Sequence, residues 1–127
     1  MMNRSVAGVL GALLAVSLTA SAIAHGSMKP SHGGVVQISG ETMVELAKTA
    51  KGVDIYVSEE DEPLPAANFV ATLTITPASG EKYRKSMTPL AGNKFTATGV
   101  KPASGDKVVV ALTEKASQTK VFVTFKM

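Results

Sequence analysis

The segment Phe69-Val70-Ala71-Thr72-Leu73-Thr74-Ile75-Thr76 decides the fold class, because apolar and hydroxyl side chains alternate along its last six residues, 71–76. Successive side chains of a β-strand point to opposite faces, so this alternation puts one face on a core and the other in water. The same pattern occurs near the end of the chain, where Val121 and Val123 lie between the polar residues Lys120 and Thr124. Both segments are therefore predicted to be half-buried strands.

Working outward, further short β-branched segments recur along the chain at the spacing of a sandwich or barrel. The segment 41–51 competes as a helix, but it has no clear cap and glycines lie on both sides, which favours a strand. Strands with no helix to cover them must pack sheet on sheet, which predicts an immunoglobulin-like antiparallel β-sandwich of seven or eight strands. A small Greek-key barrel is the alternative. The predicted strands are 35–39, 42–47, 53–58, 69–76, 82–88, 94–98, 107–113 and 121–126.

Turn residues separate these strands. Ser79-Gly80, Ala91-Gly92-Asn93 and Ser104-Gly105-Asp106 each contain a residue that tolerates positive φ, so a hairpin is predicted at all three. Residues 61–65 contain two prolines, which cannot donate to a sheet ladder, and are predicted to form a loop.

Residues 1–24 have the three parts of a secretory signal peptide: a positive start at Arg4, an apolar helix-forming run over 6–18, and small residues before a cleavage site. Cleavage is predicted after Ala22 or Ala24. The run is shorter than a membrane-spanning helix requires, so no stable membrane anchor is expected after cleavage. The predicted organisation is a signal peptide over 1–24, a flexible His/Gly segment over 25–34 and a single β-sandwich domain over 35–127.

Composition excludes several kinds of chemistry. The chain has no cysteine, so it has neither a disulfide nor a thiol nucleophile. Of its 13 basic residues only Arg4 lies in the leader, leaving 12 against 10 acidic residues, and these are scattered along the chain. Nucleic-acid binding is not expected without a basic stripe interleaved with aromatic residues. The two histidines both precede the first strand, so no rigid catalytic arrangement is proposed and the protein is not expected to be an enzyme.

The one concentrated feature is the segment 25–34, which holds both histidines and, between them, Met28. Imidazole is a common ligand of copper, zinc and nickel, and a thioether favours Cu(I). Cleavage after Ala24 would also give His25 a free α-amine that chelates together with its ring. We therefore expect a metal ion, copper or another divalent transition metal, with His25, His32 and Met28 as candidate ligands. Glu60 and Asp61 are lesser candidates in an acidic run that is otherwise read as a solvated loop.

Solvated histidines before a strand are the ordinary alternative to a metal site. Met43 and Met87 fall within predicted strands and are read as core filler, the usual role of a flexible thioether.

Several of these motifs resemble a largely uncharacterised family of small proteobacterial periplasmic proteins associated with heavy-metal efflux. They are the His-Gly-x-x-Lys-Pro-x-His-Gly-Gly-Val-Val-Gln run over 25–37, the strand over 54–57 with its acidic loop, the segment 89–94, and the closing strand over 121–126. The resemblance covers the mature chain and implies a periplasmic, metal-related role, with an efflux-system adaptor protein as a partner. Relatives often carry a histidine in the loop matching 59–63, where this chain has acids. A more distant likeness links the chain to periplasmic copper-carrier β-sandwiches.

Two functions are therefore predicted from different classes. The first is a periplasmic metal-binding protein that acts as a carrier, buffer or efflux accessory. The second is a structural or interaction module without metal, docking on an envelope or efflux-adaptor protein by a strand edge or sheet face. A histidine-brace copper oxidase is a remote third reading.

Overall fold

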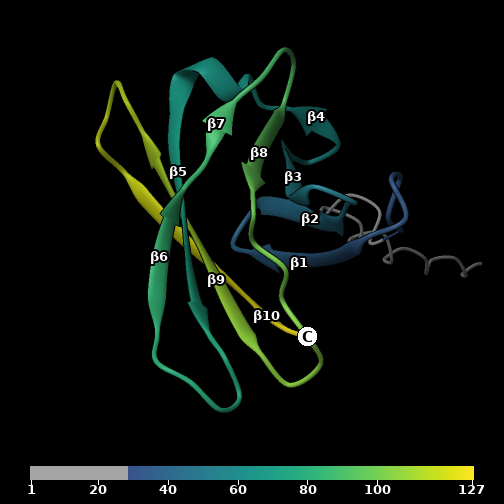
Figure 1. Ribbon diagram of the computed structural model, residues 1–127. Coiled ribbons are helices and arrows are strands. Elements are labelled where there is room, and N and C mark those ends of the chain that lie inside the picture. The colour runs from purple at the N-terminus through teal and green to yellow at the C-terminus, as the bar shows by residue number, and fades with distance from the viewer. Residues whose placement is uncertain (1–28) are drawn as a thin grey trace, which may run out of the picture.

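The computed structural model describes residues 29–127, which form an antiparallel β-sandwich (Figure 1). The signal peptide predicted over 1–24 and the candidate ligands His25 and Met28 lie outside the described residues. Within 29–127 no helix is long and apolar enough to cross a membrane. The strands of the described part are β1 (Val35–Ser39), β2 (Thr42–Lys48), β3 (Gly52–Glu59), β4 (Glu62–Pro63), β5 (Phe69–Thr76), β6 (Tyr83–Ser86), β7 (Thr88–Pro89), β8 (Lys94–Thr98), β9 (Lys107–Glu114) and β10 (Lys120–Lys126), with a 3₁₀ turn at Ala66–Asn68.

Two sheets make up the sandwich. One has the order β1-β2-β3-β8-β7, with β4 paired to the end of β3, and the other has the order β10-β9-β5-β6. The chain passes from β6 to β7 as one extended stretch that changes sheet at Met87, whose N–H still bonds to the Ala71 carbonyl (Figure 1). At the other side β1 lies beside β10, but no ladder joins them. The predicted sandwich is confirmed, but residues 29–127 form ten strands rather than seven or eight, because the predicted strand 82–88 is divided into β6 and β7 and the predicted loop contains β4. The strands of this part of the chain do not close into the Greek-key barrel that was the alternative.

The core lies between the two sheets and is built by alternation. In β5 the residues Ala71, Leu73 and Ile75 are buried, while the threonines between them are only half-buried. Strand β9 pairs with β5 so that Leu73 lies opposite Val110, which brings the inward rows of both strands into one layer. The largest fully buried side chains include Phe95 and Phe125, which close the layer from opposite sheets.

The strand predicted over 42–47 is confirmed and extends by one residue to Lys48, so the helix that competed for residues 41–51 does not form there. The prediction of a hairpin at residues 104–106 is wrong. Strands β8 and β9 belong to different sheets, and the turn carries the chain from one sheet to the other. The physical reason is a side-chain tie: the Asp106 carboxylate accepts hydrogen bonds from the N–H groups of Ala103 and Ala78. The turns around Gly80 and Gly92 do join paired strands.

The prediction of a loop over 61–65 is wrong at residues 62 and 63, which form β4 and pair with the end of β3 in a tight hairpin. Glu59 pairs with Glu62, so Glu60 and Asp61 form a two-residue turn with φ values of 51° and 69°. Positive φ at both central positions is the geometry that matches the twist of a hairpin. Pro63 is accommodated because β4 is a two-residue edge strand. Asp61 of this hairpin lines a cavity together with Glu45 of β2 and Tyr56 of β3.

Candidate functional site

The site begins with alternation in β2. Val44 and Leu46 point into the core, so Glu45 between them points to the outer face of the sheet. Glu45 is nevertheless only 6 % exposed, because the segment Lys29–Gly34 crosses above it. We call this segment the strap. A buried charge is costly unless it is hydrogen-bonded, so the strap must supply donors.

The strap supplies four donors to the Glu45 carboxylate. Oε2 accepts from the backbone N–H groups of His32 at 2.8 Å and Gly34 at 2.9 Å. Oε1 accepts from the Ser31 N–H at 3.1 Å and from the His32 ring nitrogen Nδ1 at 2.9 Å. Part of the segment predicted to be flexible is thus tied to β2 by a residue that lies outside it.

These bonds keep Glu45 ionised. Burial by itself would raise the pKa of this carboxyl, but the hydrogen bonds from the His32 ring and from the N–H groups of Gly34, His32 and Ser31 outweigh it and lower the pKa below the usual 4.5. An ionised carboxylate can only accept, so Nδ1 of His32 carries the proton in the bond between them. In the neutral ring the other nitrogen, Nε2, then has a free lone pair.

Tyr56 fixes the plane of the His32 ring. Tyr56 on β3 lies directly across from Glu45, and its ring stacks on that of His32 with a centroid distance of 3.5 Å and an interplanar angle of 0°. Lys94 lies 5.8 Å from the Tyr56 ring centroid, and its Nζ pairs with Asp54 Oδ2 at 3.5 Å. The ring of His32 is therefore held at its edge by Glu45 and on its face by Tyr56, although its side chain is 44 % exposed.

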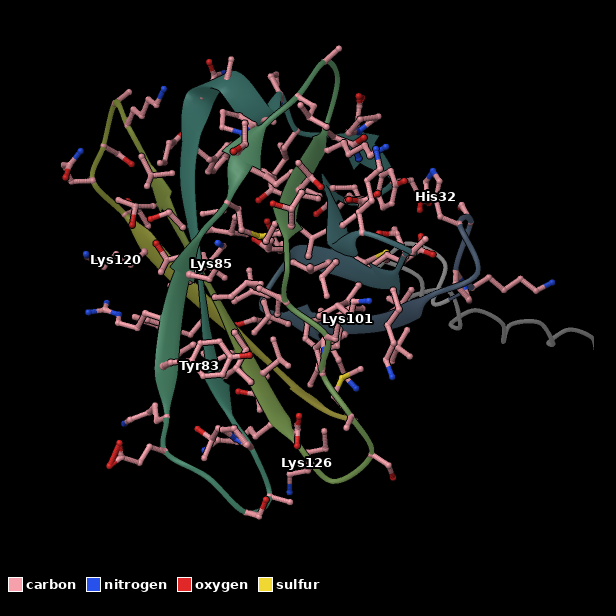
Figure 2. All side chains as sticks on the ribbon, viewed as in Figure 1. His32, Tyr83, Lys85, Lys101, Lys120 and Lys126 are labelled. Atoms are coloured by element: carbon pink, nitrogen blue, oxygen red, sulfur yellow. The ribbon has the colours of Figure 1, made fainter. Side chains whose placement is uncertain are left out.

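A cavity of about 530 Å³ opens beside His32, between the strap and the β3–β4 hairpin. His32, Tyr56 and Glu45 line it, together with Met43 and, from the hairpin, Asp61. Glu60 does not line it. Figure 2 shows His32 beside this hairpin, on the opposite side of the molecule from Lys120. The structure therefore brings together two of the candidate ligands, His32 and Asp61, and separates Glu60 from them.

Within residues 29–127 no three His, Cys, Asp or Glu side chains are grouped so as to hold a metal ion. His32 and Asp61 are thus a partial ligand set, and the other two candidates, His25 and Met28, precede the described part of the chain. The sequence reasoning missed Glu45, Tyr56 and Met43. Their shared signal is position: Met43 and Glu45 alternate with core residues on β2, as Tyr56 does on β3, which assigns all three to the outer face.

Met43 differs from Met87. Met87 belongs to the core cluster between the sheets, as predicted for a core-filling thioether. Met43 is only 9 % exposed, but it lies outside that cluster and its side chain lines the cavity on the outer face. The prediction that Met43 fills the core is therefore wrong, because Met43 lies at the candidate site.

No protein-family model matches the chain, and neither the curated proteins nor the solved structures include a significant match.

Proposed function

We propose that this is a periplasmic metal-binding protein that takes copper or another divalent transition metal and acts as a carrier, buffer or efflux accessory. The observation that carries the proposal is the Glu45–His32 pair. A metal-binding histidine commonly donates its second ring N–H to a carboxylate, which fixes the tautomer and makes the free nitrogen a better ligand. His32 has this arrangement, with Nδ1 bound to Glu45 at 2.9 Å.

The surroundings of His32 support the same reading. Asp61 supplies an oxygen donor to the same cavity, and the ring stacking on Tyr56 reduces the rotamer entropy that metal binding would otherwise cost. Met28 and His25 precede the strap in the sequence, so both donors are close to His32 along the chain. A cut after Ala24 would add the α-amine of His25 to the ligand set.

The test is titration of protein purified from the periplasm with Cu(II), Cu(I), Zn(II) and Ni(II), after its N-terminus has been determined by intact mass. We expect one ion bound at about micromolar affinity or tighter. His32→Ala should abolish binding, whereas Gln37→Ala, on β1 beside the strap, should leave it unchanged. Placing one alanine before His25 should weaken binding only if the α-amine is a ligand. Binding no tighter than that of an unstructured peptide would refute the proposal.

The outer face of the four-stranded sheet favours a second function, docking on another protein. The outward rows of this sheet carry four basic residues, Arg84, Lys107, Lys120 and Lys126, and no acidic residue, whereas the strands of the other sheet carry two basic and four acidic residues. Lys126 lies directly across from Lys107, an arrangement that costs stability, and neither forms an ion pair within 29–127. Labelled residues of this sheet, Lys85, Lys120 and Lys126, are visible in Figure 2.

An acidic protein surface is the partner that fits this face. Phe122, which is 58 % exposed, lies two residues from Lys120 on β10 and provides an apolar anchor inside a basic rim. A two-fold dimer through this face would bring like charges together, which disfavours a second copy of the chain. We expect a photo-crosslinker at position 122 to capture an acidic protein, and the double variant Lys107→Glu/Lys126→Glu to lose the adduct. Equal capture from position 35 on β1, or lysine-dependent binding to anionic vesicles, would contradict this function.

A further inference from the structure

Met43 places a thioether side chain in the lining of the cavity beside His32. It lies on the outer face of β2, two residues before Glu45, so the two side chains are neighbours on one face of the strand. Across the ladder Met43 pairs with Ser58, and Glu45 pairs with Tyr56, the ring on which His32 stacks. The thioether and the imidazole therefore occupy adjoining rows of the same sheet face and line the same cavity.

We propose that the cavity takes copper as Cu(I), with the Nε2 atom of His32 and the Sδ atom of Met43 as its ligands. This inference rests on the proposed metal-binding function and names the ion. Soft thioether ligands select Cu(I) over Zn(II) and over the hard divalent cations. A thioether carries no proton to lose, so its contribution does not require deprotonation in the way that other ligands do.

The donor count also favours Cu(I). Structural Zn(II) is almost always held by four protein ligands in a tetrahedron, and residues 29–127 bring no three His, Cys, Asp or Glu side chains together. Cu(I) accepts fewer ligands than tetrahedral Zn(II), so one imidazole and one thioether already form a substantial part of its coordination sphere.

The charges around the cavity point the same way. One basic residue, Lys29, and two acidic residues, Glu45 and Asp61, line it, which gives a net charge of −1 while His32 is neutral. A monovalent cation neutralises this charge, whereas a divalent cation leaves an excess positive charge in a partly closed space. The nearby Lys94 adds little, because Asp54 is paired with it.

The experiment compares Met43→Leu with Met87→Leu in the full mature protein. Cu(I) is titrated anaerobically against a chromophoric Cu(I) chelator, and Zn(II) and Cu(II) are titrated separately. We expect Met43→Leu to weaken Cu(I) binding by about tenfold or more while Zn(II) and Cu(II) affinities change by less than about twofold. Met87→Leu, a matched change in the core, should leave all three affinities as they are.

A second readout locates the sulfur. With methionine methyl groups labelled with ¹³C, Cu(I), which is diamagnetic, should shift the Met43 methyl resonance and leave that of Met87 in place; the two leucine variants assign the signals. If Met43→Leu leaves Cu(I) affinity and the methyl spectrum unaffected while His32→Ala abolishes binding, the metal-binding function stands and this inference fails. An equal loss for all three ions would also overturn it, since the change would then be structural. If the unmodified protein binds none of the ions, both proposals fail.

Discussion

His32 and Glu45, 13 residues apart, are joined by two hydrogen bonds that use both oxygens of one carboxylate. The backbone N–H of His32 donates to Oε2 at 2.8 Å, and the ring Nδ1 bonds to Oε1 at 2.9 Å. A single side chain on β2 therefore fixes both the main chain and the ring of His32. Since the ring is otherwise half in solvent, Glu45 determines the geometry of the candidate site.

Replacing Glu45 tests this relationship directly. Glu45→Gln keeps the volume but replaces one acceptor oxygen by a donor, which faces the N–H groups of the strap. Because hydrogen bonds to a charged group contribute more than neutral ones, we expect unfolding in urea to show a loss of about 1–3 kcal/mol. Metal affinity should fall as well. Glu41→Gln, an exposed neighbour at the β1–β2 turn, is the control and should leave both quantities unchanged.

Stability should depend on pH through the same carboxyl. The pKa of Glu45 is lowered in the folded protein, so the unfolded chain binds the proton more tightly. Its contribution is therefore complete above about pH 4.5, the usual glutamate value, and is lost as the pH falls through the lower folded-state pKa. Urea unfolding from pH 7 to pH 2 should show this decline, and Glu45→Gln should reduce it. A part should remain, because hydrogen bonds from Ala103 and Ala78 also lower the pKa of Asp106.

Gly34 allows the strap to lie close to the sheet. A Cβ atom at this position would collide with the backbone carbonyl of Leu46, which cannot move without breaking β2. We expect Gly34→Ala to detach the strap and to speed hydrogen exchange at the N–H groups of Ser31 and His32. Gly80→Ala is the control and should leave this exchange unchanged, because Gly80 does not have a positive φ and a Cβ atom there would make only ordinary contacts with Pro77. Unchanged exchange in Gly34→Ala would show that the strap does not need this close approach.

The turn at Glu60 stores backbone strain. Glu60 has a φ of 51°, a region that costs a non-glycine residue about 1 kcal/mol or more. Glu60→Gly should therefore raise the free energy of unfolding by about 0.5–1 kcal/mol, offset in part by the greater freedom of glycine in the unfolded chain. Since Glu60 does not line the cavity, metal affinity should stay within about twofold. A drop in affinity would indicate that Glu60 is a ligand after all.

Strand β5 offers a matched test of the core. Leu73 is fully buried, whereas Val70 on the outer face is 52 % exposed. Leu73→Ala should cost about 2–5 kcal/mol because it leaves a cavity between the sheets. Val70→Ala should change stability by about 0.5 kcal/mol or less. Similar losses for the two variants, measured by urea unfolding, would mean that the two faces are not buried as described.

The fold class could be predicted from single segments because alternation is a local property. The threonines of 69–76 mark the outer face without reference to any partner, and β5 has the predicted bounds. The connection at residues 104–106 could not be predicted, since a glycine turn has the same local chemistry whether it joins neighbours in one sheet or carries the chain between two sheets. The two cases are distinguished by the hydrogen bond that the Ala78 N–H donates to the Asp106 carboxylate, because it joins residues that are distant in the sequence.

The sequence by itself determined an antiparallel β-sandwich and drew attention to His32 and Asp61, because residue types and their spacing are written in the chain. Tertiary structure alone decided that Glu45 lies under the strap, that Tyr56 stacks on His32, and that Met43 lines the cavity rather than the core. The reason is that β2 alternation assigns Glu45 and Met43 to the outer face but does not say what covers that face. Covering it required the strap, which the buried carboxylate holds in place.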